Sequence, residues 1–195
     1  MSDSETILSR IAEAFEAGAK PFALENTRLA AMARDVVAVD TPDPRHELAP
    51  GLWLDYQAGS GVQTWAGPVE PAAEEDREGG LRLHLRDIGT SPWYSLSYDL
   101  GIETLRDARY LGQYLRCDSD GPARFRPCLR LQLEGGFQDV FARDLVVLTG
   151  GTQEDLIFIR LDPELLARAI GAEVLFFFEG RSFDVTLRTI EAVKV

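Results

Sequence analysis

The chain has 195 residues, of which 45% are hydrophobic and 27% charged, and its formal net charge is −12. Such a composition belongs to a folded globular protein, and the length suits one domain with an appendage. A strongly acidic chain lacks the basic face that nucleic acid and anionic membrane surfaces require, so we expect neither as a partner. No apolar stretch reaches the roughly 18 residues of a membrane span, and the acidic start lacks the features of a secretory signal, which together predict a cytoplasmic protein.

The first part of the chain carries two apolar stripes at helical spacing. Residues 2–18 begin with Ser2 and Glu5, which fit a capping box. Residues 26–37 predict a second helix, although the β-branched run from Val36 to Val39 also fits a strand. Neither helix can bury its stripe alone, so we expect each to dock on the main domain, on the other helix, or on a second copy of the chain as a homo-oligomer.

A proline-rich break separates this segment from the rest of the chain. Asp40-Thr41-Pro42-Asp43-Pro44 cannot continue a helix, because each proline removes a backbone donor and biases its neighbour toward extended structure. We therefore predict an N-terminal helical segment and linker over residues 1–47 and a second domain over residues 48–195.

From Leu48 onward the pattern changes to short runs in which apolar and polar residues alternate, the period of a strand with one face in water. The runs are Leu52–Tyr56, Val62–Trp65, Leu81–Arg86, Trp93–Leu100, Tyr110–Cys117, Phe125–Leu133, Leu145–Thr149 and Asp155–Leu161. Asp162–Gly171 predicts one short helix among them, with a cap, a proline in its first turn and a glycine stop. Eight or more short strands with one helix predict a mainly β protein, an antiparallel sandwich or barrel.

The last stretch of the chain predicts two more strands. Val174–Phe178 is almost wholly apolar, whereas Phe183–Ile190 alternates. Gly180 lies between them and can supply the positive φ of a tight turn. We therefore expect a hairpin whose first strand lies deep in a sheet and whose second has one solvated face.

Familiar catalytic motifs are missing from the sequence. It has no phosphate-binding loop, no Gly-x-Gly-x-x-Gly, no His-Glu-x-x-His and no Gly-x-Ser-x-Gly. Its two histidines, His46 and His84, are too few for a multi-histidine metal site. Cys117 and Cys128 fall on opposite faces of their predicted strands, so we expect two free thiols that point apart. We therefore expect no catalytic residues, no metal and no cofactor.

The predicted outward residues of four strands combine aromatic rings with planar hydrogen-bonding groups. Sugars suit this combination, because their C–H faces stack on rings and their hydroxyls pair with polar side chains. Arginine also binds carboxylates bidentately, which would suit an acidic sugar. The ordinary alternative is a solvated sheet face with no ligand. The ligand-binding residues predicted from this pattern are Arg82, His84, Trp93, Tyr114, Arg116 and Arg130.

Two other chemistries compete with this interpretation. Glycoside hydrolysis needs a pair of carboxylates, for which Asp99 and Asp184 are the outward candidates. The acidic loop at Glu74-Glu75-Asp76 could attract calcium, but it lacks the ordered ligand spacing of a calcium site.

The layout from Trp53 to Val195 resembles the jelly-roll β-sandwiches of carbohydrate-binding modules and galactose-binding-like domains. The segments that carry the resemblance are Trp93–Leu100, Ala108–Cys117, Leu129–Leu133, Val174–Phe178 and Phe183–Ile190. The resemblance implies a domain that binds glycans without a cofactor, on a sheet face or at loop ends. It is a likeness of fold, and jelly rolls host many functions.

The sequence thus leads to three hypotheses. The first is a non-catalytic module that binds a polysaccharide or a sugar precursor. The second is a protein-interaction or self-association module that uses the N-terminal helices. The third is a sugar-active enzyme, which would need two carboxylates in one cleft.

Overall fold

The structure, a computed structural model, describes residues 20–21, 32–70 and 79–195. Its strands are β1 (Lys20–Pro21), β2 (Val39–Asp40), β3 (His46–Ala49), β4 (Leu52–Tyr56), β5 (Gln63–Val69), β6 (Gly80–Asp87), β7 (Tyr94–Leu100), β8 (Tyr110–Ser119), β9 (Ala123–Leu133), β10 (Gly136–Phe141), β11 (Val146–Leu148), β12 (Gly151–Arg160), β13 (Gly171–Glu179) and β14 (Phe183–Lys194). Two short helices are α3 (Ile102–Leu105) and α4 (Pro163–Arg168).

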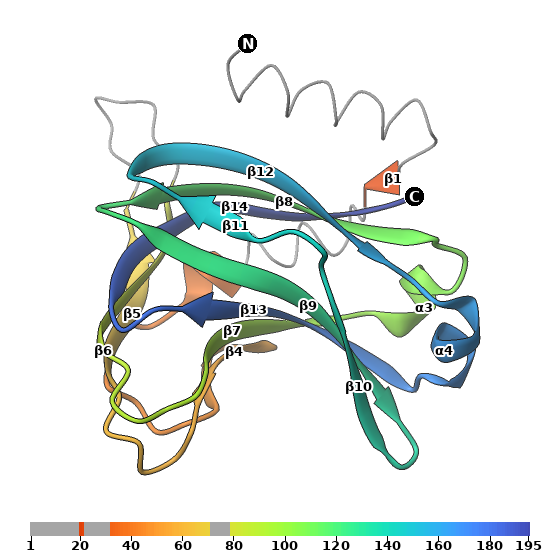
Figure 1. Ribbon diagram of the computed structural model, residues 1–195, viewed down its shortest axis with the longest axis horizontal. Coiled ribbons are helices and arrows are strands. Elements are labelled where there is room, and N and C mark those ends of the chain that lie inside the picture. The colour runs from red at the N-terminus through yellow and green to blue at the C-terminus, as the bar shows by residue number, and fades with distance from the viewer. Residues whose placement is uncertain (1–19, 22–31, 71–78) are drawn as a thin grey trace.

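The strands form two antiparallel sheets that pack face to face (Figure 1). Sheet A has the order β12-β8-β14-β6-β5-β2, with β1 also paired to β14. Sheet B has the order β10-β9-β13-β7-β4-β3, with β11 also paired to β9. The prediction of a mainly β, antiparallel sandwich is confirmed.

From β6 to β9 the chain changes sheet at every step, because β6 and β8 belong to sheet A whereas β7 and β9 belong to sheet B. The same is true of the last two strands. β13 pairs with β7 and β9, and β14 pairs with β8 and β6, so the two strands do not pair with each other. The predicted hairpin is therefore wrong. Gly180, at φ 121°, lies in an arch that carries the chain across the core.

The arch follows from burial. In both strands, alternate residues are apolar and form one apolar face. Because the arch places the two strands in different sheets, both apolar faces point into the core between the sheets. The rings of Phe178 on β13 and Phe183 on β14 stack with centroids 4.6 Å apart. The position of β13 between β9 and β7 confirms that this strand lies deep in a sheet, and Val174 and Phe176 on it are fully buried.

Polar contacts also join the two sheets inside the core. Tyr98 on β7 donates its hydroxyl to Oε1 of Gln113 on β8 at 2.5 Å, and both residues are fully buried. The hydroxyls of Thr64 on β5 and Tyr94 on β7 lie 2.6 Å apart. Each of these four buried polar groups thus has a partner in the opposite sheet, which makes its burial tolerable.

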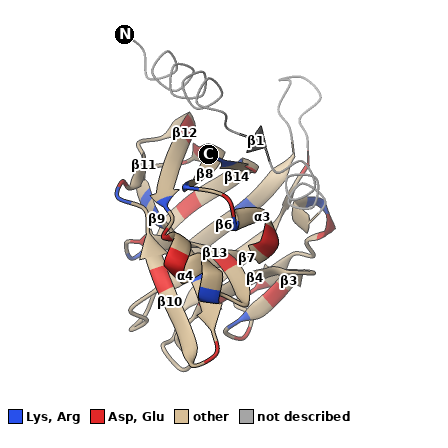
Figure 2. Cartoon of the chain, turned by 90° about the vertical axis from the view of Figure 1, so that its right-hand side faces the viewer, with Lys and Arg blue, Asp and Glu red and all other residues tan. Residues whose placement is uncertain are grey.

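The predicted helix over Asp162–Gly171 is confirmed as the shorter α4. Asp162 accepts a hydrogen bond from the backbone N–H of Glu164, and Pro163 occupies the first turn. The helix ends early because Ala169 is already extended and Gly171 begins β13. Arg106, just after α3, donates to the carbonyl oxygens of Leu166 and Ala169, which holds the two helices together at one end of the sandwich (Figures 1 and 2).

The helix predicted over residues 2–18 and the first half of the one over residues 26–37 lie outside the described residues. Of the second, residues 32–35 are helical, and a strand begins at Val39. The division of the chain into residues 1–47 and 48–195 stays a prediction. In the described part, β2 pairs with β5 and β3 pairs with β4, so residues on both sides of the proline-rich break contribute to the sheets.

Cys117 and Cys128 are both buried free thiols, as expected. Cys117 faces the core, whereas Cys128 lies on the outer side of sheet B. Burial raises the pKa of Cys128 to about 12 and that of Cys117 further. None of the helices in the described part of the chain has the length and apolarity needed to cross a bilayer.

The full burial of Phe176 leads to a prediction about stability. Phe176→Ala should lower the free energy of unfolding by about 3–5 kcal/mol, because the truncation removes a fully buried ring from the core. Phe137→Ala on edge strand β10 is the matched control. Its ring is 61% exposed and contacts Arg130, so we expect a loss of about 1 kcal/mol or less. Urea denaturation of both variants tests this, and equal losses would contradict it.

Candidate functional site

The outer side of sheet A carries a band of polar side chains around one aromatic ring. We call it the sheet A face, and its members are Trp65 on β5, Arg82, His84 and Arg86 on β6, Asp184 and Arg188 on β14, and Asp118 on β8. Strand register brings Trp65, His84 and Asp184 into one row, because His84 lies opposite both of the others. Three adjacent strands thus fix the spacing of these side chains at about 4.8 Å per strand.

Asp184 is the centre of the first polar cluster. Arg82 donates from Nε to Oδ1 at 2.8 Å and from Nη2 to Oδ2 at 2.5 Å, a bidentate pair. His84 places Nδ1 2.7 Å from the same Oδ2. Partial burial opposes ionisation, but the hydrogen bonds from Arg82 and His84 outweigh it and hold the pKa of Asp184 below its ordinary value. Asp184 therefore stays a carboxylate with both oxygens fixed in direction.

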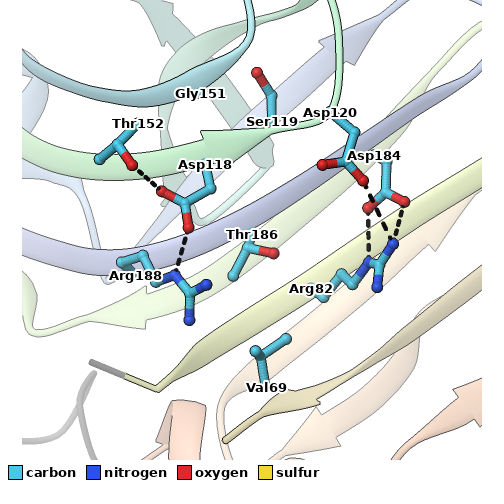
Figure 3. Close-up of a pocket in the computed structure, with 10 residues that line it drawn as sticks. All are labelled: Val69, Arg82, Asp118, Ser119, Asp120, Gly151, Thr152, Asp184, Thr186 and Arg188. Atoms are coloured by element: carbon cyan, nitrogen blue, oxygen red, sulfur yellow. Dashed lines mark hydrogen bonds and ion pairs between the residues drawn. The ribbon is translucent and has the colours of Figure 1, made fainter. Parts of the chain in front are cut away.

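Asp118 is the centre of the second cluster. Figure 3 shows it between Thr152 on β12, which donates its hydroxyl at 2.7 Å, and Arg188, which donates from Nε at 2.8 Å. A cavity of about 270 Å³ lies between the two clusters, with Val69 and Thr186 also in its lining. Arg82 and Asp184 border it on one side, and Asp118 and Arg188 border it on the other.

Trp65 borders a second cavity, and Arg82 contributes to the lining of both cavities. The six-membered ring of its indole rests against Gly67, where an added Cβ would come within 2.6 Å of two ring carbons. The ring, His84 and Arg86 line a second cavity of about 300 Å³ together with Arg82 and Asp40. Arg86 in turn donates to Asp40 and, at 3.2 Å, to the carbonyl oxygen of Thr64. An aromatic ring, fixed donors and fixed acceptors therefore surround two adjoining cavities that share Arg82.

The structure divides the six predicted ligand-binding residues between two surfaces. Arg82, His84, Tyr114 and Arg116 lie on the outer side of sheet A. Tyr114 and Arg116 lie further along β8 and line neither of the two cavities described. Burial, and then the neighbouring Glu154, raise the pKa of Tyr114 to about 12.

The other two predicted residues, Trp93 and Arg130, belong to sheet B. Trp93 directly precedes β7 and is 37% exposed. Arg130 on β9 forms a bidentate pair with Asp139 at 2.7 and 2.8 Å, and its guanidinium lies 4.2 Å from the centre of the Phe137 ring. The six residues therefore do not form one contiguous face, because consecutive strands enter different sheets.

The carboxylate pair considered from the sequence is divided in the same way. Asp99 lies on β7 of sheet B and Asp184 on β14 of sheet A, both directed away from the common core. They cannot act on one substrate from opposite sides of the sandwich. The acidic loop at residues 74–76 lies outside the described residues. In the described part of the chain, no group of three or more His, Cys, Asp or Glu side chains could hold a metal ion.

Sequence reasoning did not include Trp65 among the site residues. A signal was present in the sequence, since Val62 and Ala66 share one parity and leave Trp65 on the other, and the structure shows that Thr64 and Ala66 are fully buried. The pairing of Asp184 with Arg82 joins residues 102 positions apart in the sequence, and no local pattern indicates it.

The sequence matches no protein-family model and no curated protein. Solved structures do resemble it. One is the family 11 carbohydrate-binding module of Clostridium thermocellum in complex with a β-1,3-1,4-mixed-linked tetrasaccharide, with 14% identity, 80% of this chain and 95% of that chain covered, and a TM-score of 0.50. Another, described as a CBM4 structure, has 18% identity, 80% and 90% coverage, and a TM-score of 0.50.

A third similar structure is the Clostridium thermocellum xylanase 10B, in its CBM22-1–GH10 modules complexed with xylohexaose. It has 10% identity, 82% of this chain and 28% of that chain covered, and a TM-score of 0.53. At these identities the likeness establishes the fold alone. The resemblance stated from the sequence is confirmed at that level, since the chain has the jelly-roll β-sandwich fold found in carbohydrate-binding modules.

The lowered pKa of Asp184 predicts a pH-dependent stability. At pH 7, Asp184→Asn should reduce the free energy of unfolding by about 1–2 kcal/mol, because the charge-assisted bonds from Arg82 and His84 are lost. A carboxylate with a lowered native pKa stabilises the fold above its unfolded pKa of about 3.9, and this contribution disappears as pH falls through the native value. The gap between wild type and variant should therefore close below about pH 4 in thermal melts.

Asp120→Asn is the control for this measurement. Asp120 contacts the same arginine, but at 3.7 Å and with 81% of its side chain exposed, so its removal should change stability by less than about 0.5 kcal/mol. A gap between wild type and Asp184→Asn that is constant from pH 7 to pH 2 would contradict the assignment.

Proposed function

We propose that the protein binds carbohydrate on the sheet A face, without catalysis. The observation that carries the proposal is the Trp65 ring, held against Gly67 at the edge of a cavity and in register with His84 and Asp184. A sugar ring has an apolar C–H face and a rim of hydroxyls, so it needs a flat ring beside polar groups of fixed direction. The sheet A face provides both within two neighbouring strand spacings.

The polar groups are held in place before any ligand arrives. Arg82 and His84 fix both oxygens of Asp184, and Asp40 holds Arg86 beside the Trp65 ring. A ligand that meets groups already oriented loses less free energy to ordering them. Mixed ion pairs around an aromatic platform therefore suit recognition of a small polar ring.

The fold supports the same conclusion. Two of the similar structures hold a sugar, a mixed-linked tetrasaccharide in the family 11 carbohydrate-binding module and xylohexaose in the xylanase 10B modules. Of the residues predicted from the sequence, Arg82 and His84 are central to the proposal, and Arg116 and Tyr114 extend it along β8. Trp93 and Arg130 stay predictions for the outer side of sheet B. The cytoplasmic location, and self-association through the N-terminal segment, also remain predictions.

Trp65→Ala tests the proposal directly. It should weaken binding of a soluble glycan at least about tenfold, because aromatic anchors commonly contribute 2 kcal/mol or more to a binding interface. Titration calorimetry against a panel of neutral gluco-, xylo-, manno- and galacto-oligosaccharides, chosen after a thermal-shift screen, gives the measurement. An unchanged affinity would refute the role of this face.

Trp53→Ala is the matched control. Trp53 is also half-buried on a strand, but it lies on the outer side of sheet B, where the guanidinium of Arg45 covers its ring at 5.4 Å. The substitution should leave affinity within about twofold of wild type. If Trp53→Ala abolishes binding and Trp65→Ala does not, the ligand site belongs to sheet B.

Gly67→Ala tests the position of the ring without removing it. The new methyl group would come within 2.6 Å of the Trp65 indole and 2.9 Å of the Ala38 side chain, so the ring must tilt away from the strand. We expect a loss of affinity that approaches the loss in Trp65→Ala, with the folded state still formed in a thermal melt. Retained affinity would show that binding does not depend on the position of the Trp65 ring against Gly67.

A further inference from the structure

Four arginines on the outer side of sheet A, three in the sheet A face and Arg116 further along β8, are already paired with carboxylates of the same chain. The ion pairs are Arg82 with Asp184 and Asp120, Arg86 with Asp40, Arg188 with Asp118, and Arg116 with Glu154. From this pairing we propose that the ligand is an uncharged sugar with neighbouring hydroxyls, and that acidic sugars are rejected. This inference rests on the proposed function and names the class of ligand.

A carboxylate on the ligand would find the strongest arginine contacts occupied. Arg82 donates from Nε and Nη2 to the two oxygens of Asp184. It would use the same two donors, in the same plane, to bind the carboxylate of a uronic acid. Arg86 directs Nη2 at Asp40, at the hydroxyl of Thr41 and at the carbonyl oxygen of Thr64. A uronate must therefore displace Asp184 to use the Nε–Nη2 edge of Arg82, and beside Arg86 it meets the carboxylate of Asp40.

Charge also opposes an anionic ligand. The five ion pairs join four arginines to five carboxylates, so the face carries no excess of positive charge. Asp40 has its pKa lowered by hydrogen bonds from Thr41 and Arg86, and Asp184 also has a lowered pKa, so both remain ionised at neutral pH. The whole chain, at a net charge of −12, repels anions at longer range.

Hydroxyl groups fit the same surface without displacing anything. A hydroxyl donates one hydrogen bond and accepts others, whereas a carboxylate only accepts and a guanidinium only donates. Two hydroxyls on adjacent sugar carbons can therefore bind an arginine and its paired aspartate together. One hydroxyl accepts a hydrogen bond from the arginine, and the other donates one to the aspartate. Arg82 with Asp184 offers such a pair in the lining of the first cavity, and Arg86 with Asp40 offers one in the lining of the second, beside the Trp65 ring.

The test compares neutral and acidic ligands of equal length on the full chain. Xylohexaose and the best neutral ligand of the panel are titrated against hexagalacturonate at 50 and 500 mM NaCl. We expect wild type to bind its neutral ligand at least about tenfold more tightly than hexagalacturonate, with less than a twofold change in affinity over this salt range, because no net charge is neutralised.

Removal of one internal carboxylate should change the class of ligand. Asp184→Asn leaves Arg82 with the exposed Asp120, at 3.7 Å, as its remaining carboxylate partner in the described part of the chain, so hexagalacturonate binding should rise at least about tenfold and become salt-sensitive. Arg82→Gln removes the cation and should show no such gain. Asp40→Asn frees Arg86 at a more exposed position and supplies the same test if Asp184→Asn fails to fold.

The outcomes separate this inference from the proposed function. A wild type that prefers hexagalacturonate, or aspartate variants that gain no affinity for it, would overturn the uncharged ligand and leave sugar binding intact. A wild type that binds no member of the panel, neutral or acidic, would overturn the proposed function itself. A gain in hexagalacturonate binding by the aspartate variants and not by Arg82→Gln would support the inference.

Discussion

Burial of apolar faces from both sheets in a single core is the constraint on which the rest of the structure depends. Phe178 and Phe183 stack across it, and the hydroxyls of Thr64 and Tyr94 meet within it. Because each strand gives one face to this core, only its other face can meet a ligand. The molecule therefore has two separate outer faces, and residues near in sequence can lie on opposite sides of it.

The two outer faces differ in how their side chains are arranged. On sheet B, Ser97 is buried, and it donates to Glu173, a carboxylate that is only 2% exposed, while Arg45 covers Trp53. On sheet A, the ion pairs remain partly exposed and two cavities open between them. The sheet A face is therefore open to a polar ligand, whereas the middle of the sheet B face is filled by its own side chains.

Strand positions and their inward parity could be predicted from the sequence, because a period of two is a local property of the chain. The assignment of strands to sheets could not, because Phe183–Ile190 reads the same in a hairpin as in an arch. β10 was missed because Phe137 and Phe141 are exposed and break the expected alternation. The site was predicted in part, since Arg82 and His84 were found. The position of the Trp65 ring depends on the missing side chain at Gly67, and the role of Asp184 depends on partners about 100 residues away in the sequence.

The position of β14 has a consequence for how the chain reaches its folded state. This strand is the last in the sequence, yet it lies in the middle of sheet A, between β8 and β6. Without it, β12 and β8 have no hydrogen-bonded connection to β6 and β5, so Asp118 and Arg82 are not held on one surface. During synthesis the facing edges of β8 and β6 stay unpaired until β14 emerges, so the sheet A face can form only after residues 183–194 have been made.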